Sequence, residues 1–283
     1  MKTFALFGDP VSQSLSPVFQ NAAFKAAGVE AEYIAERVPA AELPAAVKRV
    51  RSGELAGANV TIPHKLAVLA LADFVTPEAR LIGAANWLGL NKRGKLVADN
   101  TDARGLLRAV EEAKIKPAGG KAIVVGAGGA ARAAVVALLR MEVGSVRVGA
   151  RRSAEARRLV GELRAGFPEG NPGGDERFER LAALELSSLG DSSIFCDLLV
   201  SAVPPAAWPE VESVFDETGA PWLLDLAYAK GGTPAEKWAR ARGMQALGGL
   251  PMLLHQGALS FERWLGIDFP MDAARRALNA ALG

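Results

Sequence analysis

The chain has 283 residues, half of them hydrophobic, so it can form one large domain or two ordinary ones with a sizeable core. Its 33 basic and 31 acidic residues give a formal net charge of +2, which is no general reason to expect a nucleic acid or a membrane surface as partner. The single cysteine, Cys196, excludes a disulfide within the chain, and with only two histidines a zinc site is not expected. Since neither a signal peptide nor a bilayer-spanning apolar run is recognisable, the sequence predicts a cytoplasmic protein without a metal.

Short apolar runs alternate with alanine-rich stretches along the whole chain. The runs predict strands at residues 3–8, 31–36, 57–62, 86–90, 121–127, 145–150, 197–203, 222–227 and 244–248. The stretches between them predict helices at 17–27, 41–51, 64–72, 102–114, 129–140, 153–165, 234–242 and 252–265. This alternation favours an α/β fold with mostly parallel sheets, and nine strands favour two domains over one. The Gly- and Pro-rich segment 166–177 is expected to be an exposed loop.

The segment GANVTIPHK, residues 57–65, ends an apolar strand in polar residues. Alternation along a strand places Asn59 and Thr61 on one face. A proline then favours the first turn of a helix, so Lys65 would lie near the positive end of the helix dipole, where a cation is disfavoured. On that helix His64 would face away from Lys65, into solvent. The segment is therefore either a site at a strand end or a capping threonine beside a solvated lysine.

The segment KAIVVGAGGAARAAVVALL begins as a strand and continues through three glycines into a helix. Gly126 allows a tight turn, Gly128 lets a pyrophosphate approach the backbone, and small alanines let the helix pack close to the strand. The helix N-terminus would then point at phosphate. The pattern predicts dinucleotide binding, with a bare tight turn as the alternative. The residues expected at the dinucleotide are Gly126, Ala127, Gly128, Gly129 and Ala130.

The end of the next strand indicates which dinucleotide is bound. An NAD enzyme would carry an acidic residue there to hold the ribose 2′-hydroxyl, whereas this chain has Arg151 and Arg152. Two guanidinium groups suit a 2′-phosphate by charge and by geometry. The alternative, two solvated arginines at a helix start, is weakened because cations are disfavoured there. The sequence thus favours NADP as cofactor.

If the second half of the chain binds the nucleotide, the first half must hold the substrate. Its polar clusters lie at expected strand ends: Ser14 and Ser16 before a helix, Asn86 after a bend of small residues, and Asn100, Thr101 and Asp102 before the next helix. Asp102 would also suit a plain N-cap. We expect a substrate domain over residues 1–101, joined by C-terminal helices 252–283, and a Rossmann-like NADP domain over 102–251, with a cleft between that closes over the ligands.

The motifs SLSP, GANVTIPHK, NTD, GAGGAARA and GLPMLLHQG occur in the order and spacing of the shikimate dehydrogenases, and the chain resembles this family from Phe7 to about Trp264. The resemblance implies a cytoplasmic oxidoreductase of chorismate and aromatic amino-acid biosynthesis, acting as a monomer or homodimer. Its reaction would be the NADPH-dependent, reversible reduction of 3-dehydroshikimate to shikimate.

The resemblance also implies roles for individual residues. Lys65 and Asp102 match the catalytic pair of the family. The positions matched to the substrate are Ser14, Ser16, Asn59, Thr61, Lys65, Asn86, Asp102, Tyr228 and Gln256. The positions matched to the nicotinamide are Leu226, Gly249 and Met252. Lys65 would give a proton to the developing alkoxide while Asp102 orients the ammonium, and the alternative is that Lys65 only binds the oxyanion.

The sequence departs from the family pattern at several points. Gln20 replaces a histidine, Arg152 follows an alanine and an arginine where Asn-Arg-Thr is usual, and Trp87 replaces a small threonine beside Asn86. A bulky ring there could reshape the substrate pocket, so a quinate or dual quinate/shikimate dehydrogenase is an alternative. Further alternatives are a non-catalytic NADP-binding regulator and a glycine-loop methyltransferase. His255 is expected to pack or cap rather than to react.

Overall fold

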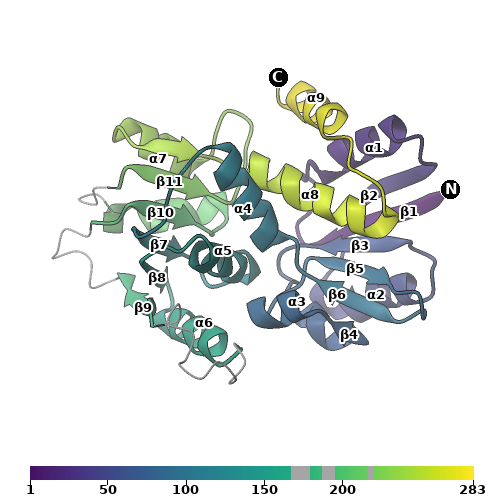
Figure 1. The fold of residues 1–283 in the computed structure, drawn as a ribbon, viewed down its shortest axis with the longest axis horizontal. Coiled ribbons are helices and arrows are strands. Elements are labelled where there is room, and N and C mark those ends of the chain that lie inside the picture. Colours follow the sequence, from purple (N-terminus) through teal and green to yellow (C-terminus); the bar gives the residue numbers. More distant parts are fainter. Residues whose placement is uncertain (167–178, 187–194, 216–219) are drawn as a thin grey trace. The chain divides into compact units, whose positions relative to one another are not determined.

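The computed structural model describes residues 1–166, 179–186, 195–215 and 220–283. The chain divides into two units, one formed by Met1–Gly105 with Leu253–Gly283 and the other by Leu106–Met252. Each unit contains a six-stranded sheet, coloured purple to blue in the first and teal to green in the second (Figure 1). The predicted α/β class with two sheets is confirmed. The predicted loop 166–177 lies outside the described residues, apart from Gly166 at the end of a helix.

The sheet of the first unit has the strand order β2-β1-β3-β5-β6-β4. Its strands are β1 (Lys2–Gly8), β2 (Ala31–Arg37), β3 (Gly57–Val60), β4 (Phe74–Val75), β5 (Trp87–Leu90) and β6 (Leu96–Asp99). β1 pairs in parallel with both β2 and β3, whereas β5 pairs antiparallel with β3 and β6. β5 and β6 are antiparallel because their short connection can form a hairpin but not the crossover that parallel strands need. This sheet is therefore mixed but mostly parallel, because only β5 runs against the other five strands.

Helices cover both faces of this first sheet. They are α1 (Ser16–Ala26), α2 (Leu43–Arg51), α3 (Pro77–Ile82), the start of α4 (Asp102–Glu112), most of α8 (Leu250–Leu265) and α9 (Met271–Leu282). Alternate residues of β1 point to opposite faces: Phe7 joins a core with Val47 of α2, and Phe4 packs against Phe24 of α1. α9 packs against α1, and both belong to the first unit (Figure 1). Because both faces of the sheet are buried, its central strands are apolar, and polar residues follow where these strands end.

α1 and α8 approach so closely that a glycine is required at their crossing. A Cβ built on Gly257 would lie 2.4 Å from Cε2 of Phe19, and the backbone oxygen of Gly257 accepts a hydrogen bond from Nε2 of Gln20 at 2.9 Å. We expect Gly257→Ala to destabilise the protein by about 1–3 kcal/mol, because a buried ring would have to move. Denaturant unfolding followed by tryptophan fluorescence measures the change. Gly161→Ala is the control, since a Cβ there meets nothing within 4 Å, and equal stabilities of the two variants would contradict the close contact.

The sheet of the second unit is parallel throughout its described pairings, in the order β12-β11-β10-β7-β8-β9. Its strands are β7 (Lys121–Val125), β8 (Ser145–Ala150), β9 (Leu181–Glu185), β10 (Leu198–Ser201), β11 (Trp222–Asp225) and β12 (Gln245–Leu247). Counted along this unit the order is 6-5-4-1-2-3, the doubly wound arrangement of dinucleotide-binding domains. Its helices include α5 (Gly129–Arg140), α6 (Ser153–Gly166) and α7 (Pro234–Ala241). In such sheets ligands bind at the carboxyl ends of the central strands, here β7 and β10.

The nine predicted strands and seven of the eight predicted helices are confirmed, with ends that differ by at most two residues. The predicted helix 64–72 is wrong, because only a 3₁₀ helix forms there, at Ala67–Leu71. The chain is already extended at Ala72 and pairs with β6 from Phe74 onward, so the helical segment is limited to the five residues of the 3₁₀ helix. The short 3₁₀ helix Ala40–Glu42 also precedes α2. No described helix is long and apolar enough to cross a membrane.

Candidate active site

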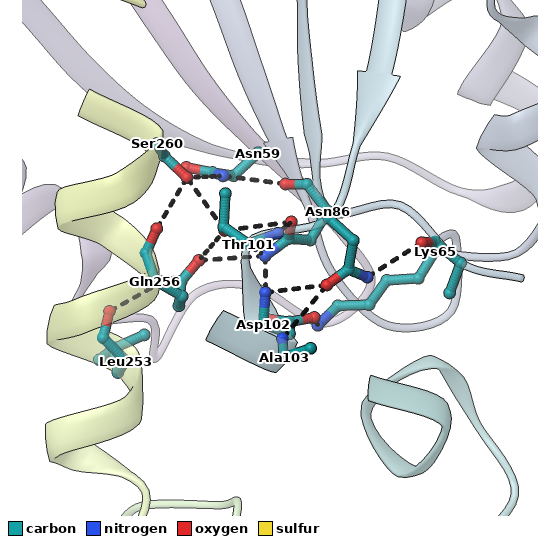
Figure 2. A network of polar contacts seen from close by, with 11 residues as sticks. Asn59, Lys65, Asn86, Thr101, Asp102, Ala103, Leu253, Gln256 and Ser260 are labelled. Carbon is teal, nitrogen blue, oxygen red and sulfur yellow. Dashed lines mark hydrogen bonds and ion pairs between the residues drawn. The ribbon is translucent and has the colours of Figure 1, made fainter. Parts of the chain in front are cut away.

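Polar side chains from three strand ends and one helix meet in the first unit. Asn59 lies near the end of β3, Asn86 immediately precedes β5, and Thr101 and Asp102 follow β6, while Gln256 projects from α8 (Figure 2). Apart from Gln256, which is 9% exposed, each is at most 5% exposed. Polar groups removed from water must find partners within the protein, so their mutual geometry is well determined.

An ion pair lies at one side of this group. Nζ of Lys65 is 2.7 Å from Oδ2 of Asp102, and the two side chains are only 16% and 4% exposed. The other carboxylate oxygen, Oδ1, accepts a hydrogen bond from Nδ2 of Asn86 at 2.8 Å. Asp102 is the first residue of α4, where the helix dipole favours a negative charge. The pair predicted to be catalytic is therefore assembled, with its ammonium held against one carboxylate.

Two expectations about these residues are corrected. Asp102 does not cap its own helix, because Oδ1 of Asn100 accepts from the backbone N–H of Asp102 at 2.9 Å and leaves the Asp102 carboxylate available to Lys65. Lys65 does not lie in the first turn of an α-helix, since only a 3₁₀ helix forms, and it starts after Lys65. The helix-dipole argument about Lys65 is therefore wrong. Its main electrostatic partner in the described residues is Asp102.

His64 is also placed differently from the prediction. It is buried rather than solvated, with 1% exposure, and Nε2 lies 2.6 Å from the backbone oxygen of Val38. The expectation assumed helical geometry, whereas residues 61–64 form a turn in which the N–H of His64 donates to the carbonyl of Thr61. The turn directs the ring inward, and His64 thereby holds the segment that presents Lys65. His255, next to Gln256, is half-buried on α8.

Asn86, Thr101 and Gln256 form a second cluster beside the ion pair. Nδ2 of Asn86 lies 2.9 Å from Oγ1 of Thr101 and 3.2 Å from Oε1 of Gln256. The backbone N–H of Thr101 donates to Oδ1 of Asn86 at 2.7 Å. Nε2 of Gln256 donates one hydrogen to the carbonyl of Leu253 at 2.9 Å, and its second hydrogen points to no described acceptor. The cluster offers neutral donors and acceptors next to a cation, a combination that suits a hydroxylated anion.

The other predicted substrate residues have separate positions. Ser14 and Ser16 lie in the turn that begins α1, where Oγ of Ser14 accepts from the N–H of Ser16 at 3.2 Å. Thr61 follows β3 and is half-exposed, and its methyl group lies against Gly8. Among the described contacts, none joins these three side chains to the Asn86 cluster. Tyr228 belongs to the second unit, after β11.

The glycine loop of the second unit has the geometry that a phosphate needs. Gly126 has φ +124°, and a Cβ on it would lie 2.8 Å from the backbone oxygen of Ala202, so only glycine fits. A Cβ on Gly128 would meet nothing within 4 Å, which leaves open space beside the loop. Among the described residues no side chain caps α5, which starts at Gly129 with Ala130 in its first turn. Its first N–H groups can therefore bind a pyrophosphate.

Arg151 and Arg152 directly follow β8, the strand beside the glycine-loop strand. Their side chains are each 72% exposed. Arg151 pairs with Glu210 at 2.7 Å, and Arg152 pairs with Glu155. Exposed ion pairs of this kind contribute little, so an incoming phosphate can replace the carboxylates. Two cationic side chains therefore lie at the end of β8, where the sequence predicts the 2′-phosphate.

Leu226 and Gly249 lie side by side in the second unit. A Cβ on Gly249 would be 2.5 Å from the backbone oxygen of Leu226, and the N–H of Gly249 donates to the carbonyl of Ala227 at 2.9 Å. Met252 follows in the first turn of α8 and is 7% exposed. Leu226 and Gly249 are thus in close backbone contact after β11 and β12, and their role at the nicotinamide stays a prediction of the resemblance.

Known proteins are similar to this chain in sequence and in fold. A family model described as "Shikimate dehydrogenase substrate binding domain" matches residues 6–88, and one described as "Shikimate 5'-dehydrogenase C-terminal domain" matches residues 249–278. The shikimate dehydrogenase (NADP(+)) of Moorella thermoacetica is 38% identical to this chain, over 99% of this chain and 93% of its own. The chain belongs to the shikimate dehydrogenase family.

Solved structures of the family have the same architecture. The Thermus thermophilus enzyme in complex with NADP(H) and shikimate is 35% identical, with a TM-score of 0.78 over 99% of this chain and 100% of that one. The Mycobacterium tuberculosis shikimate dehydrogenase is 31% identical, with a TM-score of 0.79 over 99% and 100%. The two-sheet fold is therefore that of the shikimate dehydrogenases, with a substrate domain and a Rossmann-like NADP domain.

Trp87, the departure from the family pattern beside Asn86, points away from the polar cluster. It is 4% exposed, and its Nε1 donates to the backbone oxygen of Ser260 at 3.3 Å. Its ring lies 4.7 Å from the guanidinium of Arg263, which pairs with the buried Asp99 at 2.6 Å. Neighbouring residues of a strand face opposite sides, so Trp87 anchors α8 while Asn86 faces the site. Trp87 therefore does not fill the space beside the Asn86 side chain.

The sequence did not predict that Ser260, Tyr33 and Asp225 contribute to the two sites. Ser260 and Tyr33 hydrogen-bond to Asn59 from distant parts of the sequence. Asp225 ends β11 immediately before Leu226 and is 2% exposed. It accepts hydrogen bonds from the hydroxyl of Thr233 and from the N–H of Ala227, the latter at 3.1 Å. An aspartate within the apolar run WLLDLA was the available signal for Asp225, whereas the other two look like ordinary strand and helix residues.

Burial raises the pKa of Asp225, while hydrogen bonds from Thr233, Ala227 and Ser201 act in the opposite direction. A carboxyl group whose pKa is higher in the folded protein stabilises the fold at low pH, and this contribution is lost as pH rises through the folded pKa. The stability of Asp225→Asn relative to wild type should therefore increase as pH rises through the range between the ordinary and the raised pKa. Urea unfolding across this pH range measures the difference.

Asp73→Asn is the control for this pH dependence. A side-chain hydrogen bond from Arg51 lowers the pKa of Asp73, so its contribution is present above the ordinary pKa and is lost as pH falls through the folded pKa. Relative to wild type, Asp73→Asn should therefore lose stability as pH rises, the opposite sign. The same pH slope for both variants would contradict the assignment.

Proposed function

We propose that the chain is an NADP-dependent shikimate dehydrogenase, which reversibly reduces 3-dehydroshikimate to shikimate in chorismate and aromatic amino-acid biosynthesis. The observation that carries this is the buried pair of Lys65 and Asp102, 2.7 Å apart, beside a cluster of neutral polar groups in a member of this family. The relative from Thermus thermophilus, 35% identical, is in complex with NADP(H) and shikimate.

The substrate chemistry agrees with the residues of the first unit. Shikimate is a ring carboxylate with three hydroxyl groups, so its recognition needs several neutral donors and acceptors. Ser14 and Ser16 at the start of α1 would take the carboxylate, and Thr61, Asn86 and Gln256 would take hydroxyls. Tyr228, which belongs to the second unit, remains a substrate residue predicted from the sequence. We assign the first unit to the substrate and the second to the cofactor.

The proton chemistry is assigned to the ion pair. When bound, NADPH supplies the hydride that reduces the carbonyl carbon. Lys65 would donate a proton from Nζ to the oxygen on which negative charge develops, and in the reverse direction would accept it. Asp102 holds the ammonium by the contact of Oδ2 and is itself oriented by Asn86 through Oδ1. The low exposure of both side chains keeps bulk water from taking over the proton transfer.

The second unit fits NADP. The uncapped N-terminus of α5 and the glycine loop would hold the pyrophosphate through Gly126, Ala127, Gly128, Gly129 and Ala130. Arg151 and Arg152 would hold the 2′-phosphate, and Leu226, Gly249 and Met252 would line the nicotinamide. Location in the cytoplasm and a monomeric or homodimeric state remain predictions of the sequence.

A panel of two acids against two cofactors tests this function. Purified protein is assayed with shikimate and with quinate, each with NADP and with NAD. We expect the largest kcat/KM for shikimate with NADP. A larger value with quinate would establish the quinate alternative. Binding of NADPH without turnover of either acid would indicate a regulator, and binding of S-adenosylmethionine without NADPH binding would indicate a methyltransferase.

A further inference from the structure

Ser260 is a buried hydroxyl on α8, one helical turn after Gln256. It is 0% exposed, and its hydroxyl donates to the backbone oxygen of Gln256 at 2.9 Å. Because the hydroxyl hydrogen is used in this way, the oxygen is left to act as an acceptor. It faces two side chains of the candidate active site, those of Asn59 and Thr101 (Figure 2).

Asn59 connects Ser260 to the interior of the sheet. Its Oδ1 accepts from the hydroxyl of Tyr33 at 2.8 Å, and its Nδ2 donates to Oγ of Ser260 and to the backbone oxygen of Asn86, each at 2.9 Å. Both amide hydrogens and one oxygen lone pair are therefore occupied by the protein. Asn59 is 5% exposed. In this arrangement it serves as a bridge between three elements rather than as a group directed at a ligand.

Thr101 connects Ser260 to the groups that face the substrate. Oγ1 of Thr101 lies 3.3 Å from Oγ of Ser260, 2.9 Å from Nδ2 of Asn86 and 3.4 Å from Oε1 of Gln256. Since Ser260 already donates to Gln256, only Thr101 can donate across the contact between the two hydroxyls, and its one hydrogen is shared with Oδ1 of Asn86 at 3.2 Å and with Oε1 of Gln256. A continuous set of hydrogen bonds thus runs from Tyr33 through Asn59 and Ser260 to Thr101, which we call the Tyr33–Thr101 relay.

We infer that Ser260 is a positioning residue for substrate recognition: through the Tyr33–Thr101 relay it fixes α8 so that the Gln256 amide meets a substrate hydroxyl. The inference rests on the proposed function, because it takes shikimate as the ligand. Ser260 touches neither Lys65 nor Asp102 in the described contacts, so it acts on binding rather than on proton transfer. Asn59 belongs to the same relay and acts in the same way.

Ser260→Ala tests this role. The variant leaves Nδ2 of Asn59 and the hydroxyl of Thr101 without one partner each, so the Gln256 cluster loses its fixed geometry. We expect the Kd for shikimate, measured by calorimetry without NADP, to increase about three- to ten-fold, as for the loss of one neutral hydrogen bond. The KM for shikimate should increase similarly, while kcat and the Kd for NADP stay near wild type. Ser260→Thr, which keeps a hydroxyl, should recover tighter binding than Ser260→Ala.

Ser201→Ala is the matched control, because it removes a serine hydroxyl that is also buried, at 1% exposure, in the second unit. It should leave the Kd for shikimate unchanged even if the melting temperature falls. A double-mutant cycle with Gln256→Ala gives the sharper result. If Ser260 acts through Gln256, Ser260→Ala should have little effect in the Gln256→Ala background. Tyr33→Phe, which cuts the relay at its other end, should reproduce the weaker binding if Ser260→Ala does not fold.

The positioning role would be overturned if Ser260→Ala bound shikimate as tightly as wild type, or if the effects in the cycle were fully additive. Either outcome would leave the proposed function intact. An equal loss in Ser201→Ala would also overturn it, because it would show general destabilisation. Failure of the wild type to bind shikimate would instead contradict the proposed function itself. The role would be supported if Ser260→Ala and Tyr33→Phe bound shikimate more weakly while Ser201→Ala did not, and if the effect of Ser260→Ala depended on Gln256.

Discussion

Lys65→Ala should lower kcat for shikimate oxidation by about 10²–10⁴, the usual contribution of a general acid or base. The structure places Nζ of Lys65 2.7 Å from Asp102 and beside the Asn86 cluster, so its loss would remove the proton-transfer group. The affinity for NADPH should barely change, because the glycine loop belongs to the second unit. Steady-state kinetics and NADPH titration of the variant measure both quantities.

Asp102→Ala should also be severe, because it leaves the Lys65 ammonium without its carboxylate and removes one of the acceptors of Nδ2 of Asn86. The double variant should be little worse than the worse single variant, since the second group then has no partner to serve. If Lys65 only binds a ring hydroxyl, Lys65→Ala would instead raise KM at unchanged kcat. That outcome would remove the acid/base role and leave a binding role.

Replacing Arg151 and Arg152 by Ala should weaken NADP binding much more than NAD binding. The two side chains are exposed at the end of β8, and each charge-assisted contact with a phosphate is worth roughly 1–3 kcal/mol. Removing both should therefore lower the preference for NADP by about one to four orders of magnitude. The ratio of kcat/KM for the two cofactors, with shikimate held constant, measures the preference.

Arg157→Ala is the control for this experiment. Arg157 is likewise an exposed arginine in an ion pair, 3.0 Å from Glu185, but it lies further along α6. Its replacement should leave the ratio of NADP to NAD unchanged. Equal losses of NADP and NAD affinity in the Arg151→Ala, Arg152→Ala variant would mean that these arginines do not contact the 2′-phosphate.

The strands that carry the site could be predicted because they are short apolar runs with polar residues at their ends. Asn59, Asn86 and Asp102 were found in this way, and the structure brings them within one network. The turn at Lys65 could not be predicted, because the residues 64–72 have helical composition but the chain must enter β4 directly. β4 itself has two residues, too few to show a period.

The contacts that hold the site together depend on residues far apart in sequence. Ser260 lies 201 positions from Asn59, and the pattern of α8 marks it as an ordinary helix residue. Asn100, rather than Asp102, caps α4. Both residue types are common helix caps, and the sequence alone does not show which of them pairs with Lys65. Residue types thus indicated the chemistry, whereas the supporting contacts required the folded chain.

The most direct test of the proposed function is the consumption of NADPH by the purified protein with 3-dehydroshikimate, together with identification of the product. We expect NADPH to be oxidised in equal amount to the shikimate formed. Lys65→Ala, purified in the same way, should be slower by about 10²–10⁴ and so excludes a contaminating enzyme. No NADPH consumption by the wild type, or the same rate in Lys65→Ala, would contradict the function and the role of Lys65 in it.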